Sequence, residues 1–256
     1  MGEMLFSNTH GGFSFLRGGS AYSAGVVAAP GFTIEQVRLA RAIPLMAGFA
    51  LVEERLRAAG RPRAALCAVA LRSPEPFTFE GFKEFNAIYS GVLKSWELMV
   101  DGINPVARTN VAPVAGAPGV PSLYSFAYTT AAENGAKSFV VSGAGEMPEG
   151  AAGPGDVVRR GETSPDAMAA KARCVLGVLS GRLGGLGTNW SEVTTTNIYT
   201  EHDVNALLGT EILPHIGAAG RYGVTWHYAR PPIVSIEYEM DLFGGVRETV
   251  IQNGRM

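Results

Sequence analysis

The feature that most constrains the fold of this chain is an internal repetition. Similar segments occur in the same order in the two halves of its 256 residues. Asn86 and Asn205 lie 119 residues apart, in helix-like segments. Arg108 and Arg221 lie 113 residues apart, and each follows its asparagine. Self-similarity at a fixed offset indicates two copies of one supersecondary unit. We therefore expect two tandem repeats, at residues 1–120 and 121–256.

Each half contains the same series of expected elements. The first half shows a helix at 33–59, a strand at 64–71 and a helix at 77–96. The second shows a helix at 165–183, a strand at 191–200 and a helix around 204–208. Ser164 is a suitable N-cap for the helix at 165–183, and Pro165 suits its first turn. This order predicts an α+β fold in which two helices cover each mixed sheet.

Residues 220–239, GRYGVTWHYARPPIVSIEYE, alternate like a β-hairpin. One face would carry aromatic and aliphatic side chains such as Trp226. The other would place Arg221 opposite Glu237 or Glu239, with a turn near the two prolines. A surface ion pair is the simple explanation of that polar face, and a binding cleft is the alternative.

Composition excludes several classes of function. The formal charge of −2 gives no electrostatic basis for binding nucleic acid or an anionic membrane. No apolar run is long enough to span a bilayer. The N-terminal residues lack a signal-peptide pattern, and two cysteines do not make a disulfide framework. We therefore expect a cytoplasmic protein.

Motifs for metals and cofactors are missing from the sequence. The four histidines show no zinc-binding spacing, and the glycine-rich segments match neither dinucleotide-binding nor P-loop patterns. We therefore expect no metal and no organic cofactor.

The second half resembles the reactive intermediate deaminase (Rid, YjgF-like) family. The matching segments are VVSGAGEMP, ARCVLGVLSGRLGGLG, EVTTTNIYTEHDVNAL, GRYGV and IEYE, within residues 124–243. The first half resembles a diverged copy: it keeps Asn86 and Arg108 but has no carboxylate at the position of Glu237. The resemblance implies Rid/chorismate-mutase-like repeats, a homotrimer with clefts between subunits, and hydrolysis of enamines or imines to keto acids and ammonia.

The resemblance also implies a set of site residues. Arg221 would bind the substrate carboxylate, and Glu237 would move protons, with Glu239 as the alternative. The further candidates for substrate binding are Ser142, Gly143, Asn205, Tyr128 and Arg108.

Two arginines would suit a substrate with two carboxylates, such as 2-aminomuconate from aromatic-compound degradation. Two other functions stay open. One is a non-catalytic Rid-like protein that binds small acids or has a regulatory role. The other is a ring-opening amidohydrolase, for which only one repeat has a Lys-Ser pair, Lys137-Ser138.

Overall fold

A computed structural model describes residues 4–133, 136–151 and 153–252. In these residues the strands are β1 Leu5–Asn8, β2 Phe13–Leu16, β3 Gly25–Ala28, β4 Phe32–Pro44, β5 Leu66–Arg72, β6 Ala107–Pro113, β7 Ser122–Ala131, β8 Phe139–Gly145, β9 Thr195–Thr200, β10 Thr225–Arg230, β11 Glu239–Gly244 and β12 Arg247–Ile251. The helices are α1 Leu45–Ala58, α2 Phe79–Ser95, α3 Pro165–Gly185, α4 Asn205–Leu207 and α5 Leu213–Ile216. Shorter helical turns are η1 Arg63–Ala65, η2 Pro154–Asp156, η3 Trp190–Glu192, η4 Leu208–Ile212 and η5 Gly217–Tyr222.

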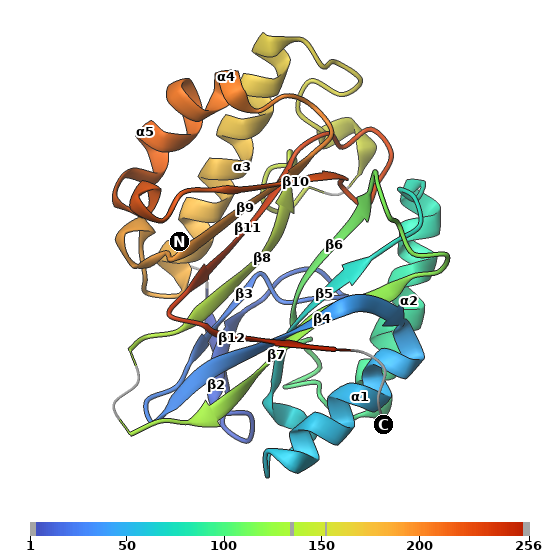
Figure 1. Cartoon of the computed structure of the whole chain (residues 1–256), viewed down its shortest axis with the longest axis vertical. Helices are drawn as coiled ribbons and strands as arrows, with labels where there is room; N and C mark the ends of the chain where they lie inside the picture. Colours follow the sequence, from blue (N-terminus) through green and yellow to red (C-terminus); the bar gives the residue numbers. More distant parts are fainter. Residues whose placement is uncertain (1–3, 134–135, 152, 253–256) are drawn as a thin grey trace.

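The described strands form a mixed sheet in the order β1-β2-β3-β8-β11-β9-β10-β6-β5-β7-β4-β12. Its central part is symmetric in topology. The series β8-β11-β9-β10 on one side corresponds to β4-β7-β5-β6 on the other, so β10 and β6 meet in the middle. Helices α3, α4 and α5 lie over one half, and α1 and α2 lie over the other (Figure 1). The observed fold is therefore α+β, with the same order of elements in both halves.

The boundary expected at residue 120 falls just before a strand that belongs to the first-half sheet. Strand β7 pairs with β4 and β5 and so completes the first-half sheet. Two strands also cross over: β3 pairs with β8, and the C-terminal β12 pairs with β4. These exchanges tie the two halves together. A division into two repeats remains a prediction, and the pairing favours a boundary after β7.

The helix predicted at 33–59 is wrong over its first part, which forms strand β4. This strand is paired on both sides, with β7 and β12, and such non-local pairing overrides the local helical periodicity. The helix α1 begins only after Pro44, which suits a helix start because it has no N–H to donate.

The predicted hairpin at 220–239 is also wrong. Strand β9 lies between β10 and β11, so these two strands do not pair with each other. The connection between them includes Ser235 in a left-handed conformation. The expected burial is reversed as well: Trp226 and Tyr228 are exposed, whereas Glu239 is buried.

The helix predicted at 165–183 is confirmed as α3. Ser164 caps it by accepting a hydrogen bond from the Ala167 N–H, and its apolar face packs on the second-half sheet. A second core lies under α1 and α2. Within the described ranges, every helix is too short or too polar to cross a bilayer.

Candidate active site

A cavity of about 430 Å³ lies between the two halves, and both halves contribute to its wall. Strand β6 supplies Arg108 and Asn110. From the second half, β8 supplies Gly143 and β11 supplies Glu239. The volume is in the range that small-molecule sites occupy.

Arg108 is the central cation of this cavity. Its side chain is buried and is packed against aromatic rings of Tyr22, Phe82, Phe85 and Tyr89. Nη2 donates to Asn86 Oδ1 of α2 at 2.7 Å. Nη1 is buried and has no hydrogen-bond partner among the described residues. Because a buried donor without an acceptor is costly, this edge of the guanidinium is suited to an anionic ligand.

Asn110 provides a second free donor on the same wall. Its Oδ1 accepts a hydrogen bond from Ser73 Oγ at 3.1 Å, which fixes the orientation of the amide. Its Nδ2 is buried and, like Nη1 of Arg108, has no partner in the described part of the chain. Residues 108 and 110 lie two positions apart on one strand and therefore share a face.

Glu239 places a carboxyl group in the same cavity. Burial, together with the charge of Asp241, raises its pKa to about 8, and the charge of Arg108 opposes this shift. At neutral pH this carboxyl group is therefore mostly protonated and can donate a proton. Gly143 makes room for it, because a Cβ at that position would overlap Glu239 Oε1.

Asp241, two positions along β11, is held by three donors. They are Thr109 Oγ1 at 2.6 Å, Asn197 Nδ2 at 2.7 Å and Tyr199 Oη at 3.1 Å. Burial raises the pKa of the Asp241 carboxyl group. These hydrogen bonds oppose that shift, because they stabilise the charged form. Asp241 is thus a buried acidic neighbour of Glu239 with its acceptors occupied.

Two more arginines line the cavity. Arg182 of α3 is buried, and its Nη1 donates to the backbone oxygen of Ser142 at 3.0 Å. Its Nε donates to Glu149 Oε2 at 2.9 Å. Arg17 is exposed at the edge of the cavity. The cavity is therefore rich in cations on more than one wall.

The structure does not bring Arg221 and Glu237 into this cavity. Arg221 lies in η5, where it is exposed, stacks on Tyr222 and donates to Ser191 O at 3.4 Å. Glu237 lies before β11, and its Oε2 is 3.0 Å from His202 Nε2, from which it accepts a hydrogen bond. The expected pairing failed because it depended on a hairpin that does not form.

The other predicted residues divide in the same way. Gly143 lines the cavity with Arg108. Ser142 lies behind the wall, where its Oγ accepts from the Arg108 N–H at 3.0 Å and donates to Ser23 O at 2.6 Å. Asn205 is exposed and bonds to Asp203, and Tyr128 is buried in the first-half core. Ser142 thus positions β6 against β8, and the last two lie away from the cavity.

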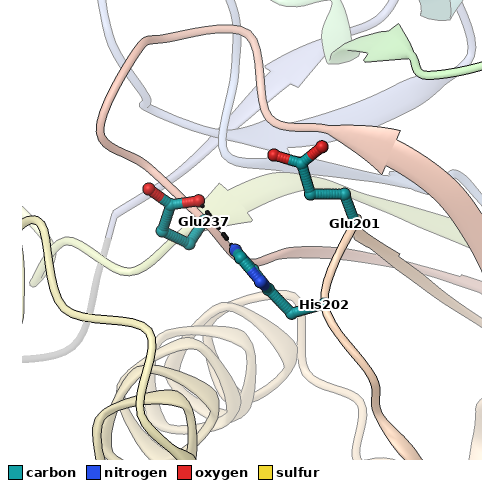
Figure 2. Close-up of side chains that lie close together, drawn as sticks. All are labelled: Glu201, His202 and Glu237. Atoms are coloured by element: carbon teal, nitrogen blue, oxygen red, sulfur yellow. Dashed lines mark hydrogen bonds and ion pairs between the residues drawn. The ribbon is translucent and has the colours of Figure 1, made fainter.

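Glu201, His202 and Glu237 form a separate cluster whose candidate ligand atoms all lie within 4.8 Å of one another (Figure 2). Zinc accepts these ligand types. The interaction of His202 with Glu237 joins the loop after β9 to the segment before β11, and Thr200 Oγ1 donates to Glu237 O at 2.7 Å. These contacts give the cluster a structural role.

Sequence reasoning missed Asn110 and Arg182 and left Glu239 as an alternative. The signal for Glu239 was its spacing of two residues from Glu237, which allowed either carboxylate. No local pattern distinguishes Arg182 from the other cations on the helix at 165–183.

Comparisons with known proteins give a consistent family. The model of the family described as 2-aminomuconate deaminase CnbZ matches residues 5–249. A 2-amino-5-chloromuconate deaminase of Comamonas testosteroni is 41% identical over 244 residues, which cover 94% of this chain and 96% of the relative.

Solved structures are more distant. A chorismatase crystal structure covers 91% of this chain and 77% of its own, with a TM-score of 0.50 and 12% identity, which shows similarity of fold alone. The YjgF gene product of E. coli covers 42% of this chain and 80% of its own, with a TM-score of 0.26 and 15% identity. The two-repeat Rid interpretation stays a prediction.

Proposed function

Since the chain belongs to the 2-aminomuconate deaminase CnbZ family, we propose that it hydrolyses a 2-aminomuconate-type acid to the keto acid and ammonia. The observation that carries this proposal is the free, buried Nη1 of Arg108 in the same cavity as the protonated carboxyl group of Glu239. An anion anchor beside a proton donor meets the two main requirements of the reaction.

Arg108 would bind the carboxylate next to the reacting carbon. A guanidinium offers two parallel N–H donors to a carboxylate, and Asn86 and the surrounding rings hold this one in place. Asn110 Nδ2 would donate to the same carboxylate or to the oxygen that adds to the substrate. Low polarity around these donors strengthens both contacts.

Glu239 would transfer the protons. Its acid form first protonates the enamine carbon, which gives the iminium ion and leaves Glu239 as a carboxylate. This carboxylate then accepts a proton from the water that adds to the C=N carbon. Return of that proton to nitrogen makes ammonia the leaving group. As the C–N bond of the carbinolamine breaks, its hydroxyl proton passes to Glu239, which gives the keto acid and restores the acid form of Glu239. Each of these steps is general acid–base catalysis by one group with a pKa near the working pH.

The direct test is ammonia release from 2-aminomuconate by wild-type protein and by Arg108→Gln. The matched control is Arg221→Gln, which removes an exposed arginine outside the cavity. We expect the Arg108 variant to lose most of its activity and the control to keep it. Equal activity in all three proteins, or no ammonia release by folded wild-type protein, would reject the proposal.

A further inference from the structure

Arg182 and Glu149 form an ion pair that faces the cavity, and its partners differ in exposure. The Arg182 side chain is 7% exposed, whereas that of Glu149 is 43% exposed. Besides the bond from Nε, the Nη2 of Arg182 donates to Glu149 Oε1 at 3.3 Å. The Glu149 carboxylate therefore lies side-on against one edge of the guanidinium, as a substrate carboxylate would.

The two residues also differ in how firmly they are held. Arg182 belongs to α3, and its Nη1 contacts the backbone oxygens of Ser142 and Gly143 on β8. Glu149 belongs to a connection outside the regular elements, at a border of the cavity. The Glu149 side chain can thus rotate into solvent at little cost. A buried arginine left without an anion, by contrast, would strongly destabilise the folded protein.

We propose that Glu149 is a place-holder for the substrate's distal carboxylate, and that Arg182 is the residue that recognises that carboxylate. With no substrate, Glu149 neutralises Arg182. When a dicarboxylic acid enters with its reacting end on Arg108, its distal carboxylate displaces Glu149 from the Nε and Nη2 edge. Arg182 is paired in both states, so specificity for two carboxylates requires no unpaired buried charge.

This inference extends the proposed function, because it assumes that Arg108 binds the reacting end. It assigns the distal carboxylate to Arg182 rather than to Arg17. Arg17 is exposed, so solvent would weaken its interaction with a carboxylate. It also distinguishes Glu149 from a simple structural partner, since a place-holder competes with the ligand and a structural partner supports it.

The test uses two six-carbon dienoic acids of the same shape. trans,trans-Muconate has a carboxylate at each end, and sorbate has a methyl group in place of one of them. Binding of both to the full chain is measured by titration calorimetry for wild type, Glu149→Gln, and the control Glu162→Gln, which breaks an ion pair with Arg159.

We expect Glu149→Gln to bind muconate about five- to tenfold more tightly than wild type does, as expected for removal of a competing, partly exposed ion pair. Sorbate affinity and the Glu162 control should not change. Weaker muconate binding, or an equal change for both acids, would overturn the inference.

A double-mutant cycle adds a second criterion. With Arg182→Gln, muconate binding should weaken, and Glu149→Gln should no longer strengthen it. Strengthening that persists without Arg182 would show that Glu149 acts only by long-range charge, and would overturn the inference. If Arg182→Gln does not fold, the Glu149 result alone decides.

The two proposals can fail separately. If Glu149→Gln selectively strengthens muconate binding but the wild-type protein releases no ammonia, the place-holder role of Glu149 stands and the deaminase function is rejected. Ammonia release without that selective strengthening would do the opposite.

Discussion

Gly143 and Glu239 lie in such close contact that any side chain at position 143 would overlap the Glu239 carboxyl group. The two residues belong to neighbouring strands, β8 and β11. The contact therefore fixes where the proposed proton donor lies, because the absence of a Cβ is what lets the carboxyl group occupy its place.

We expect Gly143→Ala to lower kcat about a hundredfold, since a displacement of about 1 Å in a reacting group costs roughly that factor. The added methyl group would overlap Glu239 Oε1 and crowd Thr109 Cγ2, so the carboxyl group must move. The matched control is Gly91→Ala on α2, where a Cβ would meet no atom within 4 Å. The rate of ammonia release is measured for both variants. Equal rates for Gly143→Ala and Gly91→Ala would show that the position of Glu239 is unimportant.

The pH dependence of the rate follows from the raised pKa of Glu239. If the acid form donates the first proton, kcat/KM should fall as pH rises through about 8. Glu239→Gln should lower kcat by about 10²–10⁴-fold. Glu237→Gln, outside the cavity, should keep both the rate and the profile. A profile unchanged between wild type and Glu239→Gln would assign the proton transfer elsewhere.

The same shift predicts a dependence of stability on pH. Between pH 4.5, the ordinary pKa, and about pH 8, folded Glu239 keeps a proton that the unfolded chain has released. The contribution of Glu239 to the free energy of unfolding is therefore largest below pH 4.5 and is lost as the pH rises to about 8. Glu239→Gln should be more stable than wild type at pH 8, with a smaller difference at pH 5. Urea denaturation at both values measures this, and a constant difference would contradict it.

Asn86 is expected to act by positioning Arg108. Asn86→Leu removes the acceptor of Nη2, so a second donor of the guanidinium becomes unsatisfied. We expect about a tenfold rise in KM with a smaller change in kcat, because the loss is mainly in binding. Asn205→Leu is the control, since Asn205 is exposed and bonds to Asp203. An unchanged KM for the Asn86 variant would mean that aromatic packing alone holds Arg108.

Local sequence signals were sufficient where local interactions decide the structure. The helix α3 was predicted from Ser164 and Pro165, which act within one turn. Strand β4 was not, because it is stabilised by partners in β7 and β12, far away in the sequence. The candidate site likewise depends on residues that are far apart in the sequence. Arg108 and Glu239 come from different halves, and neither periodicity nor spacing reveals that they share one cavity.

The exposed aromatic residues of β10 lead to the last prediction, which is self-association. Trp226 is 41% exposed and Tyr228 is 55% exposed. Val114, whose N–H bonds to Tyr228 O, is exposed beside them. Aromatic residues grouped on an open surface are typical of protein–protein interfaces, in which a few of them supply most of the binding energy. The homotrimer expected from the sequence would have a suitable contact surface here.

Tyr228→Lys should therefore shift the protein toward monomer, because a charge would be buried in the contact without a partner. Sedimentation velocity at several concentrations measures the change. Ile88→Lys is the control, since Ile88 is an exposed apolar residue on a different element, α2, and its replacement should leave the assembly intact. A wild-type protein that sediments as a monomer at micromolar concentration would contradict the prediction. A Tyr228→Lys variant that stays assembled would mean that another surface forms the contact.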